Sequence, residues 1–218
     1  MSDPARGPLR DEQAPADVVD REVAFVGMVW DVVRESFDLG AAGRLRREYV
    51  AHTSAVAVLV LDEQEKVCVI RQYRHPVGAY LWELPAGLLD VDGEEPSAAA
   101  ARELREEADL VAARWDVLVD YHSSPGGSNE GLRVYLARDV SEVPEPERHE
   151  RSGEELGMAT AWVPLDELVD GVLAGRLGNP GLVVGVLAAA AMRSRGWSGL
   201  RPVDCAWVGR GGGRAVRR

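Results

Sequence analysis

The part of the sequence that most constrains the fold is residues 87–110, which read GLLDVDGEEPSAAAARELREEADL. Its first half is rich in glycine and acidic residues, which favours a loop. Pro96 suits the first turn of a helix, since its missing N–H would be unpaired there anyway, and the alanines that follow are strong helix formers. We expect a loop that leads into a helix, with the rest of the chain supporting both.

An apolar side and an acidic side are expected on this helix. At 3.6 residues per turn, four apolar residues lie along one side, and these are Ala101, Leu104, Ala108 and Val111. Three glutamates share an arc of roughly 100° on another side, and these are Glu103, Glu106 and Glu107. Like charges at this spacing destabilise an isolated helix by roughly a few tenths of a kcal/mol, so the cluster needs a compensating positive charge.

Two explanations of the acidic cluster stay open from these residues alone. Arg102 and Arg105 can act as ion-pair partners on a solvated charged face, which is the commoner meaning of such a pattern. Alternatively, the cluster binds Mg2+, because carboxylate oxygens are the ligands that this ion prefers and it usually bridges them to substrate phosphates. The spacing of the glutamates does not separate the two.

Strand-like runs flank the helix on both sides. Before it, residues 53–61 read TSAVAVLVL, a continuous apolar run typical of a strand buried on both faces. We expect further strands at 67–73, 79–85, 115–121, 132–138 and 158–163, and closing helices at 165–174 and 180–193. This order predicts an α+β fold, an α/β/α sandwich with a mixed β-sheet.

The chain divides into four parts. Residues 1–21 mix proline, glycine, alanine and charge without periodicity, so we expect a flexible leader. Residues 22–51 contain runs rich in β-branched residues, which predict a small amino-terminal β arm. We expect the main domain at 52–195, and the residues after it, 196–218, are expected to form a flexible tail.

The composition excludes several classes of partner. The 218 residues carry a formal net charge of -11, which argues against nucleic acid or an anionic membrane surface as the main partner. Residues 181–192 form the longest apolar run, which is shorter than the roughly 20 residues of a membrane span. There is no apolar segment of signal-peptide type at the start, and the two cysteines have neither disulfide nor zinc spacing. We expect a cytoplasmic protein, in which an anionic substrate would need local arginines or metal ions.

The stretch at 87–110 resembles the box of the Nudix hydrolases, in which a glycine and a glutamate precede the pattern REUXEEXGU, where U is apolar. The residues at these places are Gly87, Glu94, Arg102, Glu103, Leu104, Glu106, Glu107 and Leu110. Six residues separate Gly87 from Glu94 where the family has five, which lengthens a loop. Asp109 replaces the second box glycine, at a helix end where glycine would allow positive φ, and aspartate is among the residues that tolerate this conformation.

The resemblance implies a Nudix fold and metal-dependent hydrolysis of a nucleoside diphosphate linked to another group. By position, Glu103 and Glu107 would bind Mg2+, or Mn2+ in its place, with Glu106 supporting them. The backbone carbonyl of Ala86 would be another ligand. Arg102 would orient a glutamate by hydrogen bonding, with a plain helix ion pair as the alternative.

Residues outside the box imply the substrate. Ser124, Pro125, Gly126 and Gly127, followed by Glu130, resemble the SPGG loop of the ADP-ribose pyrophosphatase branch. Taken alone, the same residues are an ordinary turn between strands. Together with the box, the resemblance implies that this loop, Glu130 included, binds substrate.

Three further residues are candidates for substrate binding by the same resemblance. Arg74 ends the run Gln-Tyr-Arg and resembles an arginine of that branch that contacts the substrate, a charge suited to phosphate. Arg47 and Glu48 match an Arg-Glu pair in the amino-terminal part of related enzymes. That part, in the family, is exchanged between the subunits of a homodimer and helps to form the partner's site. Surface charge is the alternative for both arginines.

The general base is expected within residues 140–157, whose acidic and proline-containing sequence predicts an exposed, mobile loop. Glu154 falls where the family's base lies, with Glu155 adjacent, and Glu150 is a weaker candidate. Closure of the loop would bring the base within reach of water at the metal. A solvated acidic loop is the alternative.

These resemblances imply an ADP-ribose pyrophosphatase, which hydrolyses its substrate to AMP and ribose 5-phosphate. A Nudix hydrolase for another nucleotide sugar or for NADH is the alternative enzyme. A non-catalytic ADP-ribose sensor is a third hypothesis, which the intact box glutamates disfavour.

Overall fold

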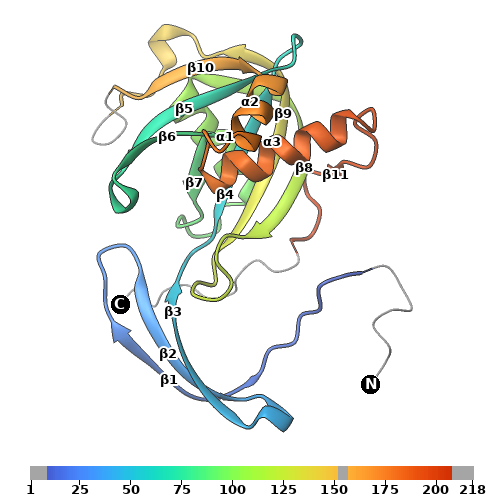
Figure 1. Ribbon diagram of the computed structural model, residues 1–218. Coiled ribbons are helices and arrows are strands. Elements are labelled where there is room, and N and C mark those ends of the chain that lie inside the picture. The colour runs from blue at the N-terminus through green and yellow to red at the C-terminus, as the bar shows by residue number, and fades with distance from the viewer. Residues whose placement is uncertain (1–8, 152–156, 208–218) are drawn as a thin grey trace.

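The computed structural model describes residues 9–151 and 157–207. Figure 1 shows a body built on one mixed sheet and a smaller sheet, the arm, below it. The main path of the body sheet runs β10-β5-β4-β9-β8-β11, with β6 paired to β5 and β7 paired to β4. Only β4 and β9 run parallel among the paired strands of the described residues. The mixed sheet expected from the sequence is confirmed.

The strands and helices of the body occur in the order predicted from the sequence. The strands of the body are β4 (Ala55–Leu61), β5 (Lys66–Arg74), β6 (Ala79–Glu83), β7 (Ala86–Leu88), β8 (Leu110–His122), β9 (Gly131–Glu142), β10 (Ala159–Pro164) and β11 (Arg201–Pro202). The helices are α1 (Pro96–Ala108), α2 (Leu165–Leu173) and α3 (Pro180–Arg193). β8 and β9 are longer than expected because they pair with each other along almost their whole length. No helix among the described residues is long and apolar enough to cross a membrane.

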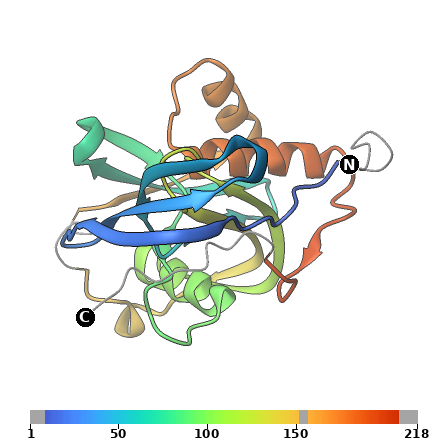
Figure 2. The ribbon, with the colours of Figure 1, turned by 90° about the horizontal axis from the view of Figure 1, so that it is seen from below.

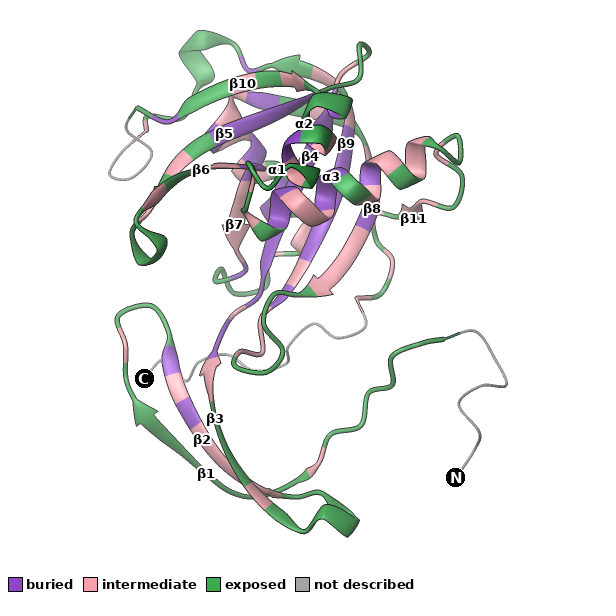
Figure 3. Ribbon diagram, viewed as in Figure 1, coloured by how far each residue is buried: buried purple, intermediate pink, exposed green. Residues whose placement is uncertain are grey.

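Helices cover both faces of the body sheet, and β4 lies in the middle. Successive side chains of a strand point to opposite faces. Val56, Val58 and Val60 pack in one cluster with Leu104 of α1. The intervening residues of β4 pack in another cluster with α2 and α3. The chain therefore forms the expected α/β/α sandwich, and the mostly buried strand is visible in Figure 3.

The buried side of α1 differs from the side expected. Its buried residues are Ala99, Ala100, Leu104 and Glu107. Ala101 is exposed, and Val111 lies beyond the helix in β8 with an exposed side chain. The expectation was wrong for these two residues because the helix turns Glu107, an acidic residue, toward the sheet.

The arm is a three-stranded antiparallel sheet of β1 (Asp17–Phe25), β2 (Asp31–Asp38) and β3 (Arg44–Ala51). β1 starts five residues earlier than the arm was expected to, because Asp17 pairs with Asp38 of β2. Seen from below, the arm crosses beneath the body with α1 on one side and α2 and α3 on the other (Figure 2). Most of β1 is exposed (Figure 3).

Residues 196–207 are docked on the body, contrary to the flexible tail expected there. β11 pairs with the outer strand β8. Arg133 of β9 is 2% exposed and donates hydrogen bonds to the carbonyls of Cys205 and Ala206. Its guanidinium also lies 4.8 Å from the centre of the Trp207 ring. The expectation was wrong for residues 196–207, because the glycine-rich composition of the tail does not reveal a buried arginine elsewhere in the chain. Residues 208–218 lie outside the described residues.

Candidate active site

Two loops meet at the amino-terminal end of β4. Val56 of β4 pairs with Gly87 of β7 on one side and with Arg133 of β9 on the other. β7 is antiparallel to β4 and β9 is parallel to it, so the loop after β7 and the loop before β9 lie at the same end of the sheet. Neighbouring strands are about 4.8 Å apart, which sets these two strands about 10 Å apart. The sequence at 87–110 and the loop at 124–130 are thus brought together by topology.

Ser54 ties both loops to the start of β4. It is fully buried and has a positive φ of 72°. Its carbonyl accepts a hydrogen bond from the N–H of Leu89, after β7, at 3.0 Å. Its hydroxyl accepts one from the N–H of Gly131, the first residue of β9, at 3.4 Å. One buried residue thus fixes the bases of the two loops.

Gly87 allows α1 to approach the backbone of β7. A Cβ placed on Gly87 would overlap the carboxylate of Glu103. The φ of this glycine is not positive, so it is needed for the close approach and not for its backbone conformation. The carboxylate of Glu103 consequently lies directly on the Gly87 backbone.

The carboxylate of Glu107 reaches Ala86, the residue before Gly87. Its Oε2 accepts a hydrogen bond from the N–H of Ala86 at 2.8 Å, and the residue is only 7% exposed. Glu103 and Glu107, one helical turn apart, therefore direct their carboxylates to the consecutive residues Ala86 and Gly87. Carboxylate oxygens and backbone carbonyls are ligands of hard divalent cations, so these groups could contribute to such a site.

Arg102 joins the other acidic residues. Its guanidinium makes two hydrogen bonds to Glu94, at 3.0 and 3.1 Å. Its Nη1 donates to Glu103 at 2.7 Å and to Glu106 at 3.1 Å. The guanidinium lowers the pKa of the Glu94 carboxyl through these bonds. Arg102 thus holds Glu103 and Glu106 together, whereas Arg105 bonds to Glu147 and takes no part in the cluster.

The charge on Glu103 is unfavourable in the absence of a further cation. Burial raises the pKa of its carboxyl, Arg102 opposes the rise, and the carboxylates of Glu106 and Glu94 add to it. Among residues 9–151 and 157–207, no three acidic, His or Cys side chains are grouped closely enough to hold a metal ion as they stand. The carboxylates beside Ala86 still fit a divalent cation, which would offset the burial of Glu103.

The residues Ser124, Pro125, Gly126 and Gly127 form a tight turn. The N–H groups of Gly127 and Ser128 both donate to the carbonyl of Ser124, at 3.0 and 2.9 Å. Val50 at the end of β3 donates its N–H to Gly127 at 2.9 Å and accepts from Asn129 at 3.4 Å. The loop is therefore held against the junction of arm and body.

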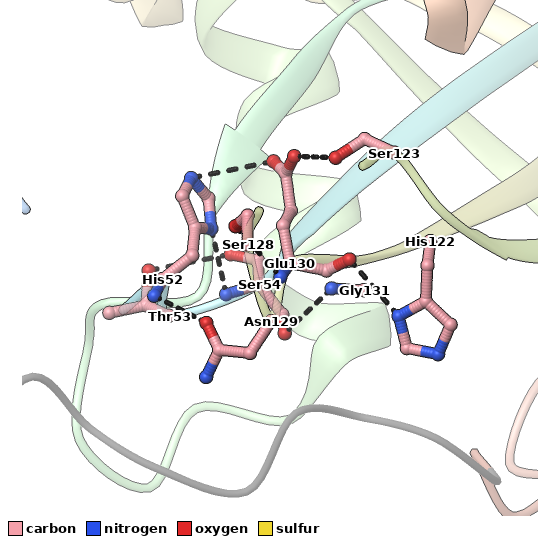
Figure 4. Close-up of polar contacts among 9 residues, drawn as sticks. All are labelled: His52, Thr53, Ser54, His122, Ser123, Ser128, Asn129, Glu130 and Gly131. Carbon is pink, nitrogen blue, oxygen red and sulfur yellow. Dashed lines mark hydrogen bonds and ion pairs between the residues drawn. The ribbon is translucent and has the colours of Figure 1, made fainter. Parts of the chain in front are cut away.

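Glu130 is held by two side chains at the end of this loop (Figure 4). Its Oε2 accepts a hydrogen bond from the hydroxyl of Ser123. Its Oε1 lies 3.4 Å from Nε2 of His52, a buried residue between β3 and β4. A single histidine ahead of an apolar strand gave no signal of this contact in the sequence.

Comparison with known proteins fits this geometry. Residues 51–180 match the model of the NUDIX domain. The chain belongs to the Nudix family. It is 42% identical over 202 residues to the ADP-ribose pyrophosphatase of Mycobacterium tuberculosis, covering 93% of this chain and 96% of the relative. It is 35% identical over 127 residues to the ADP-ribose pyrophosphatase of Bacillus subtilis, covering 58% of this chain and 68% of the relative.

A solved structure described as an ADP compounds hydrolase has the same fold. Its TM-score is 0.69 at 17% identity, and the match covers 86% of this chain and 99% of that one. The expectation of a Nudix hydrolase with a Nudix fold is confirmed. Nudix hydrolases generally use divalent cations, which agrees with the carboxylates beside Ala86.

The departure from the Nudix box at Asp109 has a structural explanation. Asp109 has φ 55° and ψ 36°, the left-handed conformation that glycine favours, and it ends α1 as expected. Its Oδ2 also forms an ion pair with Arg151 at 2.9 Å. The same Arg151 nitrogen donates to the carbonyl of Glu107, at the end of the helix. The aspartate thus ends the helix and also binds the segment that follows β9.

Arg74 and Glu83 form a pair that the sequence did not predict. Arg74 makes two hydrogen bonds to Glu83, at 2.9 and 2.6 Å. The Glu83 side chain is 3% exposed, and this residue lies three positions before Ala86. A glutamate within the apolar run AYLWELP was the available signal, since a buried carboxylate needs a partner.

Arg47 and Glu48 lie on β3 in the arm, and the structure does not bring them to α1 of the same chain (Figure 1). Arg47 donates to the carbonyl of Arg46, and Glu48 pairs with Arg34 on β2 at 2.6 Å. Glu154 and Glu155, the candidate bases, lie outside the described residues. The part of the expected loop before them is ordered, through contacts such as that of Arg151.

Proposed function

We propose that the protein hydrolyses the diphosphate of ADP-ribose, with Mg2+, to AMP and ribose 5-phosphate. The observation that carries the proposal is the position of Glu103 and Glu107 against Ala86 and Gly87, beside the loop at 124–130. The similarity over nearly the whole chain to a protein named ADP-ribose pyrophosphatase supports the choice of substrate.

The metal would be held by Glu103, Glu107 and the carbonyl of Ala86, with Glu106 in support. When bound, a divalent cation supplies neutralisation of the diphosphate charge and polarisation of phosphorus. Arg102 keeps Glu103 and Glu106 together through Nη1 and is itself fixed by Glu94. Mg2+ is our choice over Mn2+ because oxygen ligands and a phosphate substrate suit it.

The reaction adds water to one phosphorus and breaks its bond to the bridging oxygen. One proton of the water passes to a general base, and the bridging oxygen leaves with the other phosphate. Glu154 and Glu155 are our candidates for the base, following the resemblance to related enzymes. Exchange of each for glutamine tests which of them accepts the proton.

Arg74, Ser124, Pro125, Gly126 and Glu130 would bind the substrate. Arg74 is 42% exposed at its side chain, so its guanidinium is within reach of a phosphate while Glu83 holds its orientation. Glu130 offers carboxylate oxygens to the hydroxyl or amino groups of a ligand.

We also propose a homodimer in which the arms are exchanged. The arm exposes many large apolar side chains, among them Val18, Val19, Val23, Phe25, Val26, Met28 and Val29. Large exposed apolar side chains gathered on one small sheet are typical of an interface. In such a dimer Arg47 and Glu48 would lie near the partner's site, which accounts for their distance from α1 of their own chain. Sedimentation equilibrium of the wild type and of Phe25→Glu tests this part.

Both cysteines, Cys68 and Cys205, are free thiols. Free thiols persist in reducing compartments, which supports the cytoplasm as the place of action.

The test is release of AMP from ADP-ribose by the purified protein, compared with other nucleotide sugars and NADH in order of kcat/KM. Wild type should prefer ADP-ribose. Glu107→Gln keeps a group that accepts from Ala86 but loses the charge, so kcat should fall by about 100-fold or more. Preference for another compound would assign the chain to a different Nudix substrate, and ADP-ribose binding without turnover would favour a sensor.

A further inference from the structure

We propose that His52 is a positioning residue that fixes the carboxylate of Glu130 at the edge of the active site, and that Trp30 links this contact to the arm. Only the kinetic test of this proposal rests on the function proposed above. The contact of His52 with Glu130 is drawn in Figure 4.

Hydrogen bonding determines the tautomer of His52. Its Nδ1 accepts a hydrogen bond from the N–H of Ser54 at 3.1 Å. In a neutral imidazole one nitrogen accepts and the other carries the proton. The proton is therefore on Nε2, which faces Oε1 of Glu130 at 3.4 Å. The ring can donate to the carboxylate without carrying a charge.

Burial keeps this ring neutral. His52 is 6% exposed, and burial lowers the pKa of its imidazole, while the nearby Glu130 opposes the effect. A proton on Nδ1 would also break the bond from Ser54. A neutral donor leaves the negative charge of Glu130 available to a ligand, whereas an arginine at the same place would neutralise it.

Two anchors leave the Glu130 side chain little freedom. Oε1 faces His52, and Oε2 accepts from the hydroxyl of Ser123. The N–H of Glu130 donates to the side chain of Ser128 at 3.1 Å. Both oxygens keep remaining lone pairs for a ligand. A carboxylate held in one orientation loses less entropy when it binds.

The position of His52 depends on the arm and on the loop. The indole of Trp30, just before β2, stacks on the imidazole with ring centres 5.2 Å apart and planes at 24°. The N–H of His52 donates to Oδ1 of Asn129 at 2.7 Å. His52 thus touches the arm, the loop at 124–130 and, through Ser54, the base of the box loop. A change in the arm can reach Glu130 through this single ring.

Kinetics of variants at His52 tests the proposal. His52→Phe keeps a ring for Trp30 but removes both polar contacts, so KM for ADP-ribose should rise by about 3- to 10-fold with kcat within about twofold. His52→Gln carries an amide donor near the place of Nε2 and should restore KM. In a Glu130→Gln background, His52→Phe should have no further effect. His122→Ala is the matched control, because that ring is exposed and its hydrogen bond is with the main-chain carbonyl of Glu130 and not with the carboxylate.

A purely structural role would give a different result. It would lower the melting temperature and the active fraction in His52→Phe with KM unchanged. Alternatively, KM would rise in His52→Phe and stay raised in His52→Gln, because any change at this buried site would disturb the loop. Either result would overturn the proposal. Should His52→Phe not fold, Ser123→Ala removes the other anchor, and a KM equal to that of wild type would also overturn it.

Nitrogen NMR of the imidazole separates this inference from the proposed function. In wild type the Nε2–H tautomer should dominate, and Glu130→Gln should shift the pKa of His52 downward because a nearby anion is lost. If ADP-ribose is not hydrolysed but these signals respond, the proposed function fails while the contact stands. If Glu130→Gln leaves the His52 signals unchanged, the contact itself is refuted.

Discussion

Arg151 forms an ion pair with Asp109 across 2.9 Å, at the residue where the Nudix box has its second glycine. Both side chains are mostly buried, and Asp109 has the left-handed backbone that glycine would adopt. Because Arg151 also bonds to the carbonyl of Glu107, it links the last turn of α1 to the segment after β9. The substitution in the box therefore adds a contact that glycine could not make.

The first prediction concerns this residue. Asp109→Ala loses the ion pair and places an ordinary side chain in a left-handed conformation, whereas Asp109→Gly loses only the ion pair. Asp109→Ala should therefore be less stable than Asp109→Gly by about 1 kcal/mol in urea unfolding. Asp109→Asn tolerates the backbone and should differ from wild type chiefly through the lost charge. Equal stability of the alanine and glycine variants would contradict the role of the backbone.

The second prediction concerns the close approach at Gly87. Gly87→Ala places a methyl group where the Glu103 carboxylate lies, so this carboxylate must move away from the backbone of Gly87. Affinity for Mn2+, measured by electron paramagnetic resonance, should fall by about tenfold or more, with the fold retained. Gly178→Ala is the control, because nothing lies within 4 Å of its added Cβ. Unchanged Mn2+ affinity in Gly87→Ala would remove Glu103 from the ligands.

The sequence predicted the sandwich because its signals are local. Residues 55–61 are apolar throughout and form the central strand β4, and Pro96 begins α1 as its missing N–H implies. The sequence also suggested that Asp109 could replace a glycine of positive φ. The positions of the box residues could be predicted without knowledge of long-range contacts, since these residues lie in one loop and one helix.

Contacts between distant segments could not be predicted in the same way. His52 and Glu130 are 78 positions apart, and the parallel pairing of β4 with β9, together with the hydrogen bonds of Val50 to the loop at 124–130, brings them together. The orientation of α1 is set by its packing on β4 and β7. The spacing of its apolar residues therefore predicted a buried side that wrongly included Ala101, and it did not reveal that Glu107 is buried. The contact of Arg133 with the carbonyls of Cys205 and Ala206 could not be predicted from the sequence either.

The third prediction concerns this covered arginine. Arg133 is paired to Asp120 by two hydrogen bonds, at 2.7 and 2.9 Å, and holds two carbonyls of the tail. Arg133→Met leaves the two carbonyls without this donor and Asp120 with the hydrogen bond from Arg201, which should lower the free energy of unfolding by about 3 kcal/mol. Arg114→Met is the control, because Arg114 is 57% exposed and its pair with Asp116 should contribute at most about 1 kcal/mol. Protease should also cleave near residue 205 faster in Arg133→Met, whereas a loose tail would be cleaved equally in both proteins.

The last prediction concerns stability at low pH. The pKa of folded His52 is lowered from 6.5, first by burial, while Glu130 opposes the shift. The unfolded chain therefore binds this proton before the folded one, so stability falls as the pH drops below about 6.5. The groups that face the ring are Trp30, Ser54, Asn129 and Glu130, and of these only Glu130 carries a charge.

His52→Gln has no titrating ring and should lose this part of the dependence. The difference in unfolding free energy between wild type and His52→Gln should be constant above about pH 7.5 and should shift in favour of the variant as the pH falls to about 5. His122→Gln, which removes an exposed ring, serves as the comparison. Parallel curves for wild type and His52→Gln over this range would mean that the ring takes up its proton equally in both states, and that its bond from Ser54 does not hold the neutral tautomer.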